Sequence, residues 1–200
     1  LNYERGFSVL ETDEGNLIVA GSSTVDHTPF HSLKKHPDGG YLYGGEPSMM
    51  FKFSPDGTLL WQRRISGSPK FWLANFSAGD EILWQYQYPN SGNLEWIFDL
   101  TVTSSGNIVT LGTEYVVNNN DMRVMKMTKT GDILWQKIYR APGDQEGYQV
   151  QVHSSGSIAI AGYYEFKAND PDGWLLTLSQ EGELEGCASE YMENSTATAT

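Results

Sequence analysis

Short stretches of alternating apolar and polar residues run along most of the chain, and pairs of stretches flank polar turns that contain glycine. Residues 6–21, 97–112 and 147–162 align without gaps. Each segment has a first strand, a turn closing on glycine, and a second strand ending in glycine. Such alternation is typical of half-buried β-strands, and a turn glycine can adopt positive φ. These segments therefore predict β-hairpins.

A second kind of hairpin carries a tryptophan on its outgoing strand. Residues 51–62 and 125–136 align, residues 176–184 follow the pattern more loosely, and in the first two a tryptophan comes four residues after the turn glycine. Repeated bulky residues at equivalent places are typical of folds in which neighbouring units bury one face against the next. We therefore expect packing between units from three tryptophans that are each followed by glutamine: Trp61, Trp84 and Trp135.

Eight glycines mark the turns at a nearly regular pitch. They are Gly15, Gly39, Gly57, Gly79, Gly106, Gly131, Gly156 and Gly182, and neighbouring members lie 18 to 27 residues apart. A unit of about 25 residues is one hairpin with its connection, and two such units make a four-stranded propeller blade of about 50 residues. The period is clearest in the second half, where Gly106 and Gly156 are 50 residues apart, whereas Gly15 and Gly57 are 42 apart.

The pattern predicts an all-β fold, a β-propeller-like array of about four four-stranded antiparallel blades. The array forms a four-bladed ring or part of a larger propeller, and in an incomplete ring the open blade edges favour self-association. The expected blades span residues 1–45, 46–92, 93–142 and 143–187, followed by a Ser/Thr/Ala-rich tail or linker at 188–200. The alternative is a β-sandwich, whose regular turns would not require repeated residue identities.

Composition and charge narrow the range of partners. The 200 residues are 39% hydrophobic, and 13 Lys+Arg against 25 Asp+Glu give a net charge of −12 at pH 7. Binding of nucleic acids and adhesion to anionic membranes depend on positive charge. No apolar run approaches the ~18 residues of a membrane-spanning helix. We therefore expect no nucleic-acid partner and no membrane insertion. The single cysteine, Cys187, cannot form an internal disulfide.

A longer motif joins the two hairpin types in the second half of the chain. Residues 131–163 contain a turn glycine, a tryptophan, an aspartate, a Gly-Tyr-Gln-Val strand and a closing Ala-Gly. Residues 37–45 contain an Asp-Gly-Gly-Tyr turn, and residues 172–187 end at Gly-Cys. These features resemble the propeller repeats of bacterial secreted proteins, many of which are cargo of the Bacteroidetes type IX secretion system. The resemblance covers residues 6–187 and implies a secreted or cell-surface propeller.

Some segments depart from that repeat. Tyr139 is followed by Arg-Ala where the family has Gly-Gly, and residues 66–76 and 86–96 fit no repeat, so we expect a distorted or interrupted second blade. In the family, a polar linker after the last blade leads to a sorting domain. The chain begins at Leu1 without a secretory signal pattern, and we expect it to be an excerpt or a processed product.

Familiar catalytic patterns are missing from the sequence, which contains no Gly-x-Ser-x-Gly, His-Glu-x-x-His, phosphate-binding glycine loop or Cys-x-x-Cys-His. Residues 54–61 approach the aspartate box of sialidase-like propellers but lack the residue between Asp and Gly, so we interpret them as a hairpin turn. The Gly-x-x-x-Trp pattern is similar to that of quinoprotein blades, but a single cysteine cannot form their vicinal disulfide. We therefore expect no enzymatic activity.

Oxygen-rich and histidine-rich segments are the candidates for metal binding. Residues 118–121 and 169–172 are loops of the kind that holds Ca²⁺, with Asp121, Asp170 and Asp172 as ligands, although solvated turns are the simpler interpretation. Residues 26–38 contain three histidines that would suit Zn²⁺ or a similar metal if they converged: His27, His31 and His36. Prolines in that segment oppose the helix that would bring them together. Calcium is the one cofactor that the sequence suggests.

Aromatic residues outside the repeated core positions are the candidates for ligand binding. Rings on blade-edge loops can stack on sugars or anchor a protein partner, and core packing is the competing role. The candidates are Trp72, Trp96, Tyr164 and Phe166. The sequence thus predicts a non-enzymatic, secreted or cell-surface propeller that binds or adheres to a protein or glycan. The alternatives are the propeller portion of a glycan-processing enzyme and a scaffold subunit of an extracellular assembly.

Overall fold

The fold is all-β, as the alternating pattern predicts. The computed structural model of the chain describes residues 5–22, 31–45, 49–64, 72–88, 95–116, 119–141, 143–165, 171–184 and 192–194. Every regular element in these parts is a strand. Across the same residues, no helix is both long and apolar enough to cross a membrane.

The strands form four antiparallel sheets in a propeller-like array, which we name A to D. Sheet A contains β1 (Arg5–Glu11), β2 (Leu17–Ser22), β5 (Met49–Phe53) and β6 (Leu59–Arg64), in that order. Sheet B contains β3 (His31–Lys35), β4 (Tyr41–Gly45), β7 (Trp72–Phe76) and β8 (Ile82–Gln87). Sheet C contains β9 (Glu95–Val102), β10 (Ile108–Val116), β11 (Asn119–Met127), β12 (Ile133–Tyr139) and, beside β12, β16 (Met192–Asn194). Sheet D contains β13 (Asp144–Val152), β14 (Ile158–Glu165) and β15 (Pro171–Leu178).

The hairpin turns confirm seven of the eight predicted turn glycines. Gly15, Gly39, Gly57, Gly106, Gly131, Gly156 and Gly182 all have φ between 76° and 92°. The prediction for Gly79 is wrong, because the residue with positive φ in that turn is Asp80, at 67°. The Asp80 N–H donates to the Ser77 carbonyl at 3.1 Å, which places Asp80 where the other turns have glycine. Aspartate tolerates this left-handed conformation better than most residues.

Strand pairing corrects the predicted boundaries of the first two blades, 1–45 and 46–92. The hairpin β1–β2 pairs through β2 with β5, and the hairpin β3–β4 pairs through β4 with β7, so sheets A and B interleave along the chain. The boundaries failed because they assumed that consecutive hairpins share a sheet. Sheets C and D do follow that rule, and β9–β12 and β13–β15 lie inside the ranges 93–142 and 143–187.

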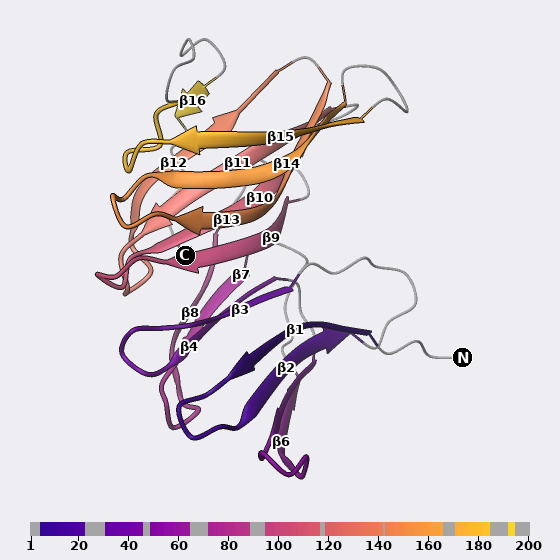
Figure 1. Cartoon of the computed structure of the whole chain (residues 1–200), viewed down its shortest axis with the longest axis vertical. Coiled ribbons are helices and arrows are strands. Elements are labelled where there is room, and N and C mark those ends of the chain that lie inside the picture. The colour runs from indigo at the N-terminus through magenta and orange to yellow at the C-terminus, as the bar shows by residue number, and fades with distance from the viewer. Residues whose placement is uncertain are drawn as a thin grey trace.

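The four sheets follow one another in an arc, with sheet A at the lower end and sheet D toward the upper end of the view (Figure 1). The first strand of each sheet lies toward its neighbours: β1 contacts β3, β3 contacts β9, and β9 contacts β13. Most hairpin turns gather along one rim of the arc, at the left of Figure 1, and the turn next to β6 lies at the bottom of the view. The opposite ends of the strands therefore form a second rim.

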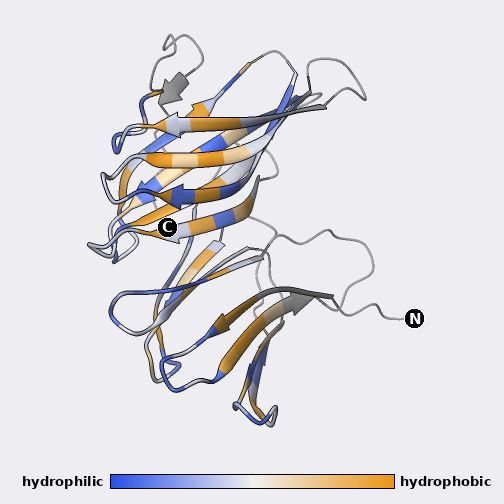
Figure 2. Cartoon of the chain, viewed as in Figure 1, coloured by the Kyte–Doolittle hydropathy of each residue, from blue (hydrophilic) through white to orange (hydrophobic). Residues whose placement is uncertain are grey.

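Three hydrophobic clusters fill the spaces between neighbouring sheets, and Figure 2 shows the hydrophobic residues along the strands with hydrophilic residues at the turns. Trp61 packs between A and B, Trp84 between B and C, and Trp135 between C and D. Each indole N–H donates to a turn of the next sheet: to the Asp80 carboxylate at 3.0 Å, the Lys129 carbonyl at 2.9 Å and the Gln180 carbonyl at 3.1 Å. The predicted role of these tryptophans is confirmed.

Part of the predicted tail, residues 188–200, forms a strand. β16 pairs antiparallel with the edge of sheet C, with Met192 opposite Tyr139 and Asn194 opposite Lys137. The prediction of a tail or linker is therefore wrong for residues 192–194. The small-polar composition of this segment did not indicate a strand, whereas β12 presents an edge with which a passing segment can pair.

Candidate binding site

A cavity of about 380 Å³ opens between sheets C and D. It runs from the end of β12, where Arg140 and Ala141 border it, along β15 to Leu184, just after the turn that follows β15. Most of its wall is apolar, and we name it the C–D pocket: Met122, Tyr139, Arg140, Ala141, Gln145, Tyr164, Trp174, Leu175, Leu176 and Leu184. A cleft with this lining between two elements is the usual form of a ligand site.

Strand alternation places the apolar wall. Trp174 and Leu176 are two residues apart in β15 and both pack against the cluster that joins sheets C and D. From sheet C, Tyr139 is buried at the end of β12, and its hydroxyl donates to the Gly182 carbonyl at 2.7 Å. Burial raises the pKa of Tyr139, so its hydroxyl keeps the proton that makes this bond.

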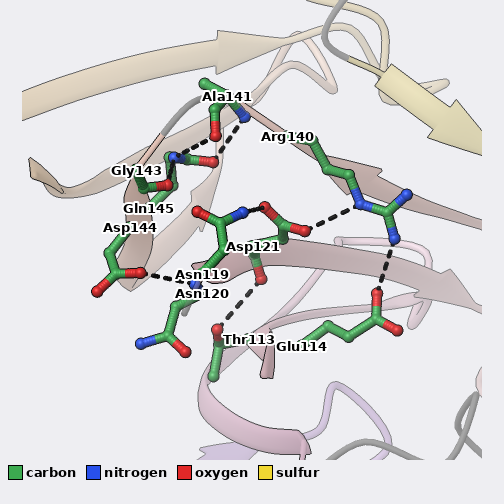
Figure 3. Close-up of polar contacts among 10 residues, drawn as sticks. All are labelled: Thr113, Glu114, Asn119, Asn120, Asp121, Arg140, Ala141, Gly143, Asp144 and Gln145. Atoms are coloured by element: carbon green, nitrogen blue, oxygen red, sulfur yellow. Dashed lines mark hydrogen bonds and ion pairs between the residues drawn. The ribbon is translucent and has the colours of Figure 1, made fainter. Parts of the chain in front are cut away.

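Arg140 follows β12 directly and borders the pocket between two carboxylates (Figure 3). Its Nε donates to Asp121 Oδ2 at 2.9 Å, and its Nη2 lies 3.3 Å from Glu114 Oε2. Asp121 and Glu114 are paired across β10 and β11, and both are buried. Burial raises the pKa of Asp121, and the Arg140 guanidinium opposes that shift. The arginine charge is thus already neutralised by the protein.

Gln145 holds the short loop between β12 and β13. Its Oε1 accepts the Ala141 N–H at 2.8 Å, and its Nε2 donates to the carbonyls of Ala141, at 3.0 Å, and Gly143. Figure 3 shows this amide enclosed by the loop. Because its hydrogen-bonding groups are engaged within the protein, Gln145 contributes shape to the pocket floor and leaves recognition to the apolar groups.

Acidic residues from sheets C and D meet beside the pocket. The Asn120 N–H donates to Asp144 Oδ1 at 2.8 Å, and its side-chain amide donates to Glu146 Oε1 at 2.8 Å. The other oxygen of Glu146 accepts the Tyr148 hydroxyl at 2.9 Å. Two carboxylates here, with the two on Arg140, give four negative charges against one positive, a local excess of three. Such a field favours a neutral or basic ligand over an acidic one.

The predicted ligand-binding residues do not gather in one place. Tyr164 lines the C–D pocket. Trp72 packs into the core between sheets A and B, with its ring 5.4 Å from that of Tyr43, and Trp96 lies on β9, paired with Thr113. Phe166 lies outside the described residues. Trp72 thus has the core-packing role that competes with ligand binding, and ligand binding by the other candidates stays a prediction.

The predicted calcium loops are partly strands. Asp121 lies in β11 with its carboxylate bound to Arg140 and to the Asn119 amide at 2.6 Å, which corrects its assignment to an open metal loop. Asp172 pairs with Tyr164 in the β14–β15 ladder, which also makes it part of a strand, and Asp170 lies outside the described residues. Ladder pairing and an arginine partner leave Asp121 poorly suited to a cation. Calcium binding elsewhere stays a prediction.

Two of the three histidines lie in the part of the chain that the structure describes. His27 lies outside the described residues, and His31 begins β3. His36 is buried in the β3–β4 turn, where its Nδ1 accepts the Asp38 N–H at 3.3 Å and its Nε2 lies 3.3 Å from the Gly106 carbonyl. Nε2 thus serves the contact between sheets B and C, and Nδ1 is engaged within its own turn. Where side chains are described, no three His, Cys, Asp or Glu residues gather as a metal site.

Most residues of the C–D pocket escaped sequence reasoning. In the sequence, Trp174 and Leu176 have the pattern of ordinary strand residues. Arg140 differs from the secreted propeller repeats only in standing where they have the first glycine of Tyr-Gly-Gly. The pocket is lined from five strands, β11 to β15, and this juxtaposition depends on the packing of C against D. The usable signal was that departure, because Arg140 and Ala141 replace two small residues at the mouth of the pocket.

Comparisons with known proteins show a distant likeness among solved structures. No family model matches the sequence, and no curated protein sequence matches it. Among solved structures, the chain is similar to a protein of unknown function from Bacteroides caccae, solved at 1.35 Å resolution. The two share 11% sequence identity with a TM-score of 0.46, over 96% of this chain and 82% of the other.

Proposed function

We propose that the chain is a non-enzymatic binding module of a secreted or cell-surface protein, and that its ligand is a protein segment with an apolar side chain. The observation that carries the proposal is the C–D pocket, a 380 Å³ cavity whose wall is almost entirely apolar. Burying one Leu- or Phe-sized side chain from water contributes about 1.5–3 kcal/mol. The resemblance to secreted propeller repeats supports a location outside the cell.

The polar groups around the pocket favour a protein ligand over a glycan. A sugar needs hydrogen-bond partners as well as an aromatic face, but Gln145 and Arg140 are engaged by the loop and by two carboxylates. The excess of negative charge beside the mouth favours lysine or arginine next to the apolar side chain of the ligand. The proposed ligand is therefore a segment that combines one large apolar residue with a basic neighbour.

Selection of peptides tests the proposal. A random peptide library displayed on phage is selected against the 200-residue chain, and the binders are measured on Ala141→Leu, which partly fills the pocket. Only the backbone of Ala141 bonds to Gln145, so the loop is preserved. The matched control is Ala78→Leu, the same change in an exposed turn of sheet B. Selected peptides should share a large apolar residue and bind Ala141→Leu about 10- to 150-fold more weakly.

Two outcomes contradict the proposal. Peptide binding that Ala141→Leu and Ala78→Leu change equally would show that the pocket takes no part. A glycan array run in parallel covers the other ligand class: glycan binding that Ala141→Leu abolishes would make the pocket a sugar site and overturn the protein-ligand proposal.

A further inference from the structure

One hydrogen bond between neighbouring sheets recurs along the arc. Both partners lie in the first strand of a sheet. The acceptor is the side chain seven residues before the turn residue of one sheet. The donor is the backbone N–H six residues before the turn residue of the next sheet. The bonds are Leu33 N–H to Ser8 Oγ at 3.1 Å, Leu100 N–H to Ser32 Oγ at 3.3 Å, and Val150 N–H to Asp99 Oδ2 at 3.1 Å. The same contact thus joins A to B, B to C and C to D, as expected of a repeat fold.

The two ends of the arc carry the two halves of this bond. At the equivalent acceptor position of sheet D stands Gln149, an exposed residue whose amide carbonyl can accept a hydrogen bond. At the equivalent donor position of sheet A stands Val9, whose side chain is 62% exposed on the edge strand β1. Sheet D, at one end of the arc, therefore presents an acceptor, and sheet A, at the other end, presents a donor.

The back face of sheet A, which points away from sheet B, has the apolar pattern of a covered face. Three positions are buried in each of the other sheets: six residues before the turn residue, two after it and four after it. They are Leu33, Tyr41 and Tyr43 in sheet B; Leu100, Ile108 and Thr110 in sheet C; and Val150, Ile158 and Ile160 in sheet D. In sheet A the same positions are Val9, Leu17 and Val19, of which Leu17 is 40% exposed. Phe51 and Phe53 extend this face, since they pair with Val19 and Leu17 and stack at 6.3 Å.

The front face of sheet D, which points away from sheet C, shows the matching exposure. Residues three and five after the turn residue are buried in the other sheets: Ile18 and Ala20, Leu42 and Gly44, Val109 and Leu111. In sheet D these positions are Ala159, half-buried, and Ala161, exposed. Leu175 is paired with Ala161 and is 75% exposed. A face of small residues on D is thus left open at one end, and a face of larger apolar residues on A at the other.

We propose that the front face of sheet D in one copy packs on the back face of sheet A in a second copy. The occupant is inferred by continuity, because the D-on-A contact would repeat the contact that already joins A to B, B to C and C to D. Gln149 would accept the Val9 N–H, and the alanines of D would receive the phenylalanines of A. Contacts of this head-to-tail kind close into rings when the rotation permits. Two copies of four sheets then make a ring of eight, within the size range of propellers.

Sedimentation velocity on the 200-residue chain tests this ring. Over about 1 to 100 µM the chain should pass from monomer to a compact dimer. Association should strengthen from about 0.05 M to 0.5 M salt, because each copy carries a net charge of −12 and salt screens the repulsion. Ala161→Arg on D and Val9→Arg on A should each weaken dimerisation at least about a hundredfold, since either places an unpaired charge in the contact.

Mixing the two variants separates a head-to-tail contact from a symmetric one. The Val9→Arg copy keeps an intact sheet D, and the Ala161→Arg copy keeps an intact sheet A, so the mixture should recover a heterodimer joined at one contact. Leu134→Arg, at an exposed apolar residue of β12, is the control and should dimerise normally. Circular dichroism checks that each variant folds, and Ala159→Arg replaces Ala161→Arg if the latter does not.

Three results would overturn the proposed ring. A chain that stays monomeric at about 100 µM in high salt has no such contact. A dimer lost in Val9→Arg but kept in Ala161→Arg is joined through two copies of sheet A. Open oligomers that grow with concentration would show that the contact forms without closing at two copies.

Discussion

Asp80 is the turn residue whose replacement most sharply tests the contact between sheets A and B. Seven of the eight described hairpin turns have glycine at this position, and Asp80 alone holds the left-handed conformation with a side chain, at φ 67°. Reasoning from backbone preference alone, Asp80→Gly should stabilise the protein by about 1 kcal/mol, because glycine removes the cost of positive φ. The contacts of the carboxylate predict the opposite sign.

The Asp80 carboxylate collects three donors from two sheets. Lys52 Nζ lies 2.8 Å and 3.0 Å from its two oxygens, the Trp61 indole N–H donates at 3.0 Å, and the Tyr41 hydroxyl donates at 3.2 Å. The Lys52 side chain is only 7% exposed, and that of Asp80 is 16% exposed. Burial, with a further contribution from Asp80, raises the pKa of Tyr41, so this hydroxyl remains a donor. Sheet A thus places a buried ammonium against a carboxylate of sheet B.

The magnitude follows from the charge that is left behind. Removing one partner of a buried ion pair costs about 3–5 kcal/mol, and the lower end applies here because the carboxylate is partly reached by water. Subtracting about 1 kcal/mol for the relieved backbone leaves a net loss of roughly 2–3 kcal/mol for Asp80→Gly. In a chain of this length that loss lowers the melting temperature by about 4–12 °C.

Urea unfolding followed by tryptophan fluorescence measures this loss, with two variants as controls. Asp80→Asn tolerates the left-handed turn and keeps an acceptor, so it should lose less stability than Asp80→Gly. Lys52→Met removes the ammonium, so adding Asp80→Gly to it should cost at least about 1.5 kcal/mol less than in the wild type. A neutral or stabilising Asp80→Gly, or additive effects in this cycle, would refute the role assigned to the carboxylate.

Three further predictions concern sheets C and D. Asp121→Asn should raise the melting temperature more at about pH 7 than at about pH 4, because burial raises the folded pKa of Asp121 and the wild type loses stability as pH rises through it; an equal effect at both pH values would contradict this. Asp99→Ala removes the acceptor of the Val150 N–H and should cost about 2–4 kcal/mol in urea unfolding, with faster hydrogen exchange at that amide. Trp135→Phe keeps the ring but loses the bond to the Gln180 carbonyl, and calorimetry should show a loss of about 1 kcal/mol.

The local chemistry of the turns made the hairpins predictable. Glycine at positive φ and a tryptophan four residues later are short-range signals, and they located seven turns and the three inter-sheet indoles. The spacing of four residues from turn residue to tryptophan also identifies the turn residue of the eighth turn. Trp84 lies four residues after Asp80 but five after Gly79, so the position of the tryptophan marks the true turn residue better than the nearest glycine does.

The pairing of hairpins depended on a signal that spans a longer distance. Sheets A, B and C each join one hairpin that lacks the tryptophan four residues after its turn to one that has it. The first half of the chain has two hairpins of the first kind before two of the second. The separation of 42 residues between Gly15 and Gly57 was therefore the spacing within one sheet. The C–D pocket was less accessible, because Arg140 and Trp174 meet only when strands from two sheets pack.

The interleaving makes sheets A and B depend on each other in a way that C and D do not. Extending a connection is inexpensive, since each doubling of a loop adds only about 0.6 kcal/mol of closure cost, so pairing β2 with β5 past β3 and β4 barely affects stability. The consequence is topological: sheet A is completed only after the first half of sheet B has been passed, and sheet B only after sheet A. The A–B contact must therefore form as one unit, and the charged bond at Asp80 lies within that unit. Sheets C and D, built from consecutive hairpins, add to it as ordinary repeats do.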